Sequence, residues 1–197
     1  MKRFYCSLLA LCLFSALAPA NAPDDVPVFE ITPVKSTIRF GVKASVPIEG
    51  VFDKWNATLT FKSTDVTTGV LDIKIEAASV DTGSSMKDGK LKSKDFFNVK
   101  ENSYITFHST KLVQTGPNTF EVDGNFTIRG VTRPEKLTFT VTGIGTGSGA
   151  IAGTMAFDRK EYGMNSGIPF IKIADRVEVT VDLQGRRVSG PPMNLNH

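Results

Sequence analysis

The chain has 197 residues, of which 41% are hydrophobic and 22% charged, and its 23 basic side chains nearly balance 20 acidic ones. This length can bury the core of one domain, and such an even charge balance excludes the dense positive surface that binding to a nucleic-acid backbone requires. We therefore expect no nucleic-acid partner.

The first 22 residues have the pattern of a secretory signal peptide. Lys2 and Arg3 precede an apolar run over residues 4–17, and small residues in A-x-A spacing end at residue 20 and again at residue 22. We predict cleavage after one of these two positions. The apolar run is shorter than the ~20 residues that a membrane-spanning helix needs, so we expect export and no integral membrane span.

Removal of this segment takes away Cys6 and Cys12, the two cysteines of the chain, and leaves 21 basic side chains against 20 acidic ones. The mature protein then has no thiol for a disulfide, so its core must stabilise the fold alone. We predict one domain over residues 23–188. A flexible tail is expected over residues 189–197, where two consecutive prolines follow the last periodic segment.

Eight segments of the chain alternate apolar and polar side chains with period two, which is typical of strands with one buried face. In chain order they cover residues 38–42, 55–61, 71–77, 105–109, 120–128, 137–141, 151–157 and 177–183, and residues 28–31 are a candidate ninth strand. Turn residues separate most of these segments at hairpin distances. We therefore predict an all-β fold with a largely antiparallel sheet.

Eight antiparallel strands form either a sandwich or a barrel, and the alternation leaves both open. The apolar faces are rich in phenylalanine, whereas the opposite faces carry charges and threonines. The apolar faces must therefore turn inward, opposite to the arrangement of a transmembrane barrel. A barrel of eight strands either fills with side chains or holds one small ligand.

One connection, DTGSSMKDGKLKSKDFFNV over residues 81–99, is much longer than a hairpin. Ser84 or Ser85 is a candidate N-cap for a short helix over residues 86–91, and a second short helix is expected over residues 94–97. Phe96 and Phe97 have no strand face to join. We predict a short helical lid over one end of the sheet, in which replacing either ring changes ligand exchange more than it changes stability.

Few side chains suit catalysis. Without the signal peptide there is no cysteine nucleophile, and the two histidines are His108, on the outward parity of its strand, and His197, the last residue. A metal site built from several histidines is therefore not expected. A pair of carboxylates stays open, because 20 acidic residues offer many combinations and no spacing singles one out. We expect neither an enzyme nor a cofactor.

Five motifs resemble, in order, the signatures of the YceI-like family. They are ASVDTG (78–83), LKSKDFFNV (91–99), YITFHST (104–110), GNFTIRGVTRP (124–134) and FDRKEYGM (157–164). The resemblance implies an eight-stranded lipocalin-like antiparallel barrel, exported to the periplasm. It also implies a hydrophobic ligand inside the barrel, such as a polyisoprenoid, an isoprenoid quinone or a fatty-acid derivative, and it suggests a homodimer.

With this resemblance, the inward and lid side chains become candidates for the wall of a ligand tunnel. They are Phe40, Trp55, Phe96, Phe97, Phe107, Phe126, Ile128, Phe139, Met155, Phe157 and Met164. Without it, a plain phenylalanine-rich core is the better interpretation. A structural or protein-interaction barrel with a filled interior is therefore the alternative to a lipid carrier, and a carboxylate-dependent hydrolase is the third hypothesis.

Three polar residues in the motifs, Asp95, Arg129 and Arg133, have two interpretations. Loop side chains of this kind commonly fix backbone geometry through hydrogen bonds. We favour that role over a direct contact with the head group of a ligand.

Overall fold

The computed structural model describes residues 26–143, 147–167 and 172–194. The predicted signal peptide and His197 lie outside the described residues. The described residues form eleven strands in one sheet. The strands are β1 (Val28–Ile31), β2 (Thr37–Ala44), β3 (Ile48–Phe52), β4 (Trp55–Thr60), β5 (Val70–Glu76), β6 (Val80–Asp81), β7 (Tyr104–Gln114), β8 (Thr119–Ile128), β9 (Val131–Thr142), β10 (Ser148–Asp158) and β11 (Ile173–Ser189).

The helical elements within these residues are short. There is one α-helix, α1 (Ser85–Lys92), and four 3-10 turns, η1 (Pro33–Lys35), η2 (Val66–Thr68), η3 (Ala77–Ser79) and η4 (Arg159–Tyr162). None of the described helices is long and apolar enough to cross a membrane.

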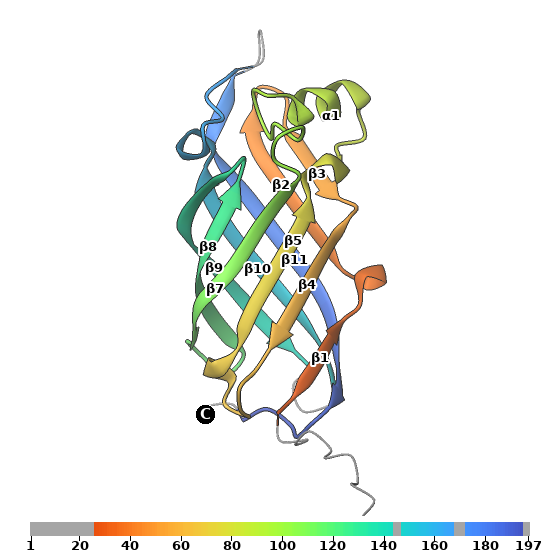
Figure 1. Ribbon diagram of the computed structural model, residues 1–197, viewed down its shortest axis with the longest axis vertical. Helices are drawn as coiled ribbons and strands as arrows, with labels where there is room; N and C mark the ends of the chain where they lie inside the picture. Colours follow the sequence, from red (N-terminus) through yellow and green to blue (C-terminus); the bar gives the residue numbers. More distant parts are fainter. Residues whose placement is uncertain (1–25, 144–146, 168–171, 195–197) are drawn as a thin grey trace, which may run out of the picture.

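The sheet is antiparallel and curls into a barrel (Figure 1). Its strand order is β4-β5-β7-β8-β9-β10-β11-β2-β3-β6, and β1 also pairs with β11. β11 organises the curl, because it pairs with β10 along one edge and with β2 and β1 in succession along the other. This architecture confirms the predicted lipocalin-like barrel with a short helical lid.

All eight predicted strands are present, and β1 is the candidate ninth. The sequence did not predict β3 and β6. In β3, Gly50 occupies the inward position between Ile48 and Phe52, so the apolar alternation is broken there. The ring of Phe40 lies where a side chain of Gly50 would be, since a Cβ atom there would be 2.7 Å from its Cε1. β6 has only two residues, too few to show a period.

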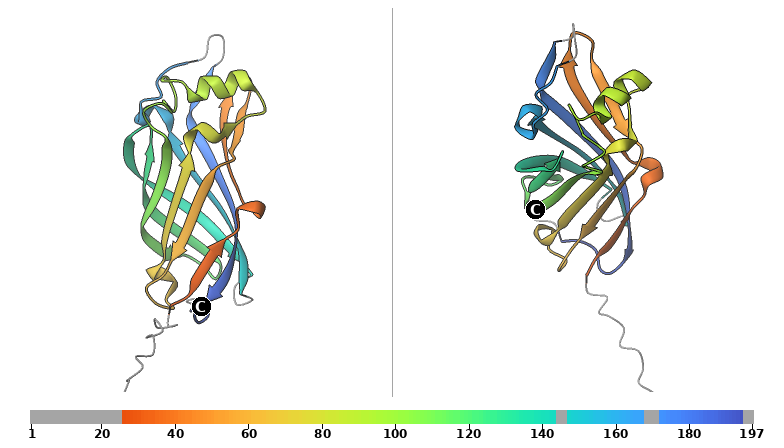
Figure 2. Two further views of the ribbon diagram at one scale, coloured as in Figure 1. Left: turned by 45° about the vertical axis from the view of Figure 1, so that its right-hand side comes forward. Right: turned by 45° about the horizontal axis from the view of Figure 1, so that its top comes forward.

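At one end of the strand order, β4 meets β1 at a seam. The two strands lie side by side (Figures 1 and 2), but within the described residues no backbone hydrogen bond joins them. The seam is closed by side chains instead. Phe29 of β1 and Phe61, just after β4, are in edge-to-face contact with ring centroids 5.7 Å apart.

The predicted lid covers the end of the barrel near β2 and β3, which we call the lid end (Figure 2). α1 begins after Ser84, whose side chain makes no capping hydrogen bond. The second predicted helix is absent, and residues 94–97 form turns instead. Ser93, the residue expected to cap that helix, donates its hydroxyl to the carbonyl of Lys90 over 2.7 Å. Met86 points into water with 84% exposure, whereas Phe96 and Phe97 are 4% and 7% exposed.

The opposite end, which we call the far end, is where the described chain terminates (Figure 1). Here residues 190–194 run across the barrel. Asn194 fixes this segment through its backbone N–H, which donates to the Thr64 carbonyl over 2.8 Å, and its side-chain amide, which donates to the Thr64 hydroxyl over 3.0 Å. The flexibility predicted for the tail stays a prediction.

Candidate functional site

The barrel encloses two apolar cavities, one at each end. The lid-end cavity has a volume of about 70 Å³ and lies under Phe96 and Phe97. The far-end cavity, of about 120 Å³, lies under Pro192 and Met193. None of the described residues lines both cavities. The continuous tunnel that we expected is therefore interrupted in this structure.

One layer of inward side chains separates the two cavities. On β7, β8, β10 and β11 it lies between a residue that lines the lid-end cavity and one that lines the far-end cavity, and its members line neither. We call it the middle layer; it consists of Ile73, Phe107, Val122, Leu137, Met155 and Val181, all of them buried. In a barrel, the inward side chains of neighbouring strands lie at the same height along the barrel axis and so form layers.

The eleven candidate residues are divided by this layer. Seven line the lid-end cavity: Phe40, Phe96, Phe97, Phe126, Ile128, Phe157 and Met164. Phe139 lines the far-end cavity, and Phe107 and Met155 belong to the middle layer. Trp55 is half-buried at the start of β4 and lines neither cavity.

Aromatic rings pack against each other at both ends of the interior. Phe126, Phe157 and Tyr162 form a cluster with ring centroids 5.1–5.6 Å apart. At the far end, Phe120 stacks on Phe139 with centroids 5.2 Å apart. Each such pair contributes about 0.5–1.5 kcal/mol beyond the burial of its area. The interior is therefore well packed, and a long ligand has to displace rings.

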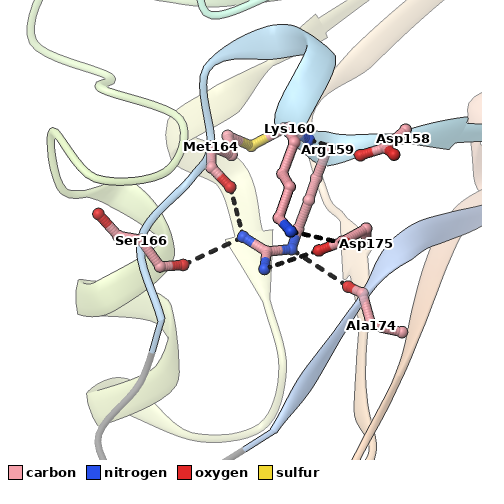
Figure 3. A network of polar contacts seen from close by, with 7 residues as sticks. All are labelled: Asp158, Arg159, Lys160, Met164, Ser166, Ala174 and Asp175. Carbon is pink, nitrogen blue, oxygen red and sulfur yellow. Dashed lines mark hydrogen bonds and ion pairs between the residues drawn. The ribbon is translucent and has the colours of Figure 1, made fainter.

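Arg159 borders the lid-end cavity and is the one charged side chain among its described lining residues. Figure 3 shows its polar contacts. It is 6% exposed, which is unusual for arginine. Its Nε donates to the carbonyl of Ala174 over 3.1 Å, and its Nη1 donates to the carbonyls of Met164 and Ser166. The Nη2 atom pairs with Asp175 at 3.2 Å. These contacts join η4, the following loop and the start of β11.

Asp175 receives a second cation from the surface. Lys160 Nζ lies 2.8 Å from Asp175 Oδ2. This hydrogen bond, with the charges of Lys160 and Arg159, lowers the pKa of the Asp175 carboxyl below its usual value. The stabilisation from this carboxylate is therefore complete at neutral pH and is lost as the pH falls through the lowered pKa.

The three polar motif residues fix loops, as we favoured. Arg129 donates to the carbonyls of Gly163 and of Lys94, the latter over 2.8 Å, and so ties the β8–β9 turn to η4 and to the lid. Arg133 Nε donates to the carbonyl of Glu161 over 3.0 Å. Asp95 pairs with Lys90 Nζ at 2.7 Å within the lid. The lid is thus fastened to the barrel rather than loosely attached.

Tyr162 is fully buried, and its hydroxyl donates to Glu135 Oε1 over 2.7 Å. Burial, followed by this hydrogen bond and the charge of Glu135, raises the pKa of the Tyr162 hydroxyl well above its usual value. The hydroxyl therefore stays protonated and acts as a hydrogen-bond donor.

We expect Tyr162→Phe to lower the free energy of unfolding by about 1.5 kcal/mol, because the variant loses a hydrogen bond to a charged acceptor and keeps the ring cluster. Urea denaturation would measure the loss. Tyr104→Phe is the matched control, since Tyr104 is 45% exposed. An equal loss in both variants would show that the Glu135 contact contributes nothing.

The outward face carries one of the two histidines of the chain. His108 lies outside, as its parity predicted, with Nδ1 2.5 Å from Asp72 Oδ1 and more than half of its side chain exposed. Within the described residues, no group of three His, Cys, Asp or Glu side chains could hold a metal ion.

The far-end cavity has one charged residue in its lining, Arg187, which the sequence analysis missed. The period of two that runs inward through Val181 and Leu183 continues to Gly185 and then to Arg187. Extending the alternation to residue 187 would have predicted that Arg187 faces the interior.

A curled antiparallel sheet around enclosed apolar cavities defines a lipocalin-like barrel. A YceI-like domain model matches residues 29–185, and the chain belongs to the YceI-like family. A UPF0312 protein of Shewanella sp. strain ANA-3 is 28% identical over 166 residues, which cover 80% of this chain and 86% of that protein.

Two solved structures share the fold. BcnA of Burkholderia cenocepacia has a TM-score of 0.71 and 26% identity, over 79% of this chain and 99% of that one. A polyisoprenoid binding domain from Saccharophagus degradans has a TM-score of 0.66 and 16% identity, over 82% of this chain and 99% of that one. At that identity, the second likeness shows the fold alone.

Proposed function

We propose that the protein is a periplasmic carrier that holds a long amphiphilic lipid inside the barrel and does not act as an enzyme. The ligand classes are a polyisoprenoid, an isoprenoid quinone or a fatty-acid derivative. The observation that carries the proposal is the pair of enclosed, almost wholly apolar cavities within a YceI-like barrel. The polyisoprenoid-binding relative of the same fold supports the ligand class.

The cavities are small for such a ligand. An apolar cavity of about 150 Å³ accommodates benzene, so either cavity, at about 120 and 70 Å³, takes only a few carbon atoms as it stands. A longer chain has to separate packed rings, at about 0.5–1.5 kcal/mol for each pair. Burial contributes ~0.8 kcal/mol for each methylene, so ten of them gain on the order of 8 kcal/mol. Burial therefore outweighs the loss of several ring contacts, although ordering the chain consumes part of the gain.

The second candidate function is a barrel with a filled interior that acts through its outer surface. The observation that favours it is the packing itself, since the middle layer and the ring cluster leave no continuous tunnel within the described residues.

Extraction separates the two functions. Protein purified from the exported fraction without detergent is extracted with organic solvent, and the extract is analysed by mass spectrometry. A carrier should release about one long apolar molecule for each barrel. Absence of any such molecule, together with failure to bind added lipid, would overturn the carrier proposal.

A pair of variants tests whether the lipid lies inside the barrel. Ile151 lines the far-end cavity, whereas its neighbour Ala152 is exposed on the outer face of the same strand. Ile151→Phe should reduce the extracted lipid, because the added ring fills the cavity. Ala152→Phe adds the same ring outside and should leave the lipid content unchanged. Equal lipid content in both variants would place the lipid elsewhere.

A further inference from the structure

The far-end cavity is a compartment with its own boundary. Its walls come from both sides of the seam, with Phe29 and Ile31 on one side and Leu59 on the other. The middle layer closes it toward the lid. A chain that enters at the far end therefore meets the middle layer before it reaches any lid residue.

Phe107 is the largest side chain of the middle layer, and its position depends on a glycine of the neighbouring strand. Gly124 takes an inward position of β8, two residues before Phe126, which pairs with Phe107 of β7. A Cβ atom on Gly124 would lie 2.4 Å from Cζ of Phe107, so the ring occupies the space of the missing side chain. The ring thus extends across the inner face of β8, between the two cavities.

Arg187 lies at the other boundary of this compartment. It is the last inward residue of β11 that lines the cavity, and it is half-buried. Its Nη1 donates to the carbonyl of Gly190, and within the described residues no acidic side chain pairs with it. An arginine in this position can lay its stem along an apolar wall while its guanidinium stays at the polar rim.

Among the described residues that line the lid-end cavity, the cation is Arg159. The guanidinium of Arg159 is already bonded to three carbonyls and to Asp175. Arg187 is therefore the better partner for an acidic head group, since a guanidinium binds carboxylate or phosphate through charge-assisted hydrogen bonds.

We propose that the far-end cavity is the binding site for an acidic amphiphile, with its head group on Arg187 and the end of its apolar tail against Phe107. This inference rests on the proposed lipid-binding function and adds the charge of the ligand, its orientation and a limit on its length. Phe107 sets that limit, because a tail that passes the middle layer must displace its ring.

The head-group arm compares dodecanoate with dodecanol, which have the same tail, by isothermal titration calorimetry. Arg187→Gln should raise the dissociation constant of dodecanoate roughly tenfold, because one charge-assisted interaction at a partly exposed rim is lost. It should leave the dissociation constant of dodecanol unchanged. Arg186→Gln is the matched control, since Arg186 points outward and pairs with Glu30 at 2.7 Å, and it should change neither value.

The tail arm uses unbranched fatty acids from octanoate to stearate. In the unaltered protein, affinity should rise with tail length and then level off. Phe107→Leu and Phe107→Ala should move the plateau to longer acids, with a gain of up to about fourfold for each further methylene, which corresponds to ~0.8 kcal/mol. Phe107→Leu keeps the test interpretable if Phe107→Ala does not fold. Val80→Ala truncates a side chain that is 2% exposed and lines neither cavity, and it should leave the plateau unchanged.

The outcomes separate this inference from the function on which it rests. If the acids and alcohols bind but Arg187→Gln weakens both equally, or no Phe107 variant moves the plateau, the proposed site is wrong and the carrier function stands. If neither compound class binds the folded protein at any length, both proposals fail together.

Discussion

Replacing Arg159 with alanine will lower the free energy of unfolding by about 3–5 kcal/mol, because several hydrogen bonds of a buried guanidinium are lost together. The arginine bonds to three backbone carbonyls and one carboxylate in a region where its side chain is 7% exposed. The variant leaves the three carbonyls without this donor, and each buried group that loses its partner costs about 1–3 kcal/mol, whereas Asp175 keeps its contact with Lys160.

Urea denaturation followed by circular dichroism would measure this loss. Arg159→Lys should recover only part of the stability, because a single ammonium cannot reach acceptors on both the loop after η4 and β11 with the fork geometry of a guanidinium. Arg176→Ala is the control, since Arg176 pairs with Glu178 at 3.5 Å with 70% of its side chain exposed. Its effect should stay within about 0.5 kcal/mol. A loss of that small size in Arg159→Ala would show that the network does not hold the fold.

The second large effect is expected in the lid. Phe97 is 7% exposed and contacts Phe52 and Phe40, with ring centroids 5.9 and 6.5 Å away. Phe97→Ala should lower the free energy of unfolding by about 3–5 kcal/mol, as other truncations of buried phenylalanines do. From the sequence we expected this replacement to change ligand exchange more than stability. The structure leads to the opposite expectation, because the Phe97 ring is part of the core.

Met86→Ala provides the matched control for the lid. Met86 lies in the same segment but is 84% exposed, so its removal should change stability by less than about 0.5 kcal/mol. Thermal unfolding of both variants, with the exchange rate of a bound fluorescent fatty acid measured below the transition, tests the two readouts together. If Phe97→Ala exchanges the ligand faster at unchanged stability, Phe97 is a lid residue, as the sequence predicted, and is not part of the core.

The sequence predicted the all-β fold and most inward residues because alternation is a local property. Phe120, Phe126 and Phe139 stand at inward positions of their strands, and each is buried. Strand β3 was not predicted, because glycine stands at its inward position 50 where the alternation requires an apolar residue. The reason for this glycine is visible only in the fold, where the pairing of β2 with β3 places the Phe40 ring in the space of the missing side chain.

The site was less predictable because its decisive features depend on contacts between distant segments. Arg159 has a charged side chain, which sequence rules place outside, and it is buried only because the fold brings several acceptors to it. The separation of the interior into two cavities depends on the strand pairing of Phe107 with Phe126, which lets the Phe107 ring lie over Gly124. Arg187, in contrast, follows the parity of its strand and could have been found.

At the seam between β1 and β4, the girth of the barrel is set by side-chain contacts. Between the paired strands of the sheet, an increase in girth would break backbone ladders. At the seam, the strands meet through side chains such as Phe29 and Phe61, and separating one aromatic pair costs only about 0.5–1.5 kcal/mol. Because Leu59 and Ile31 line the far-end cavity from the two sides of this seam, a wider girth would enlarge that cavity while every ladder stays intact.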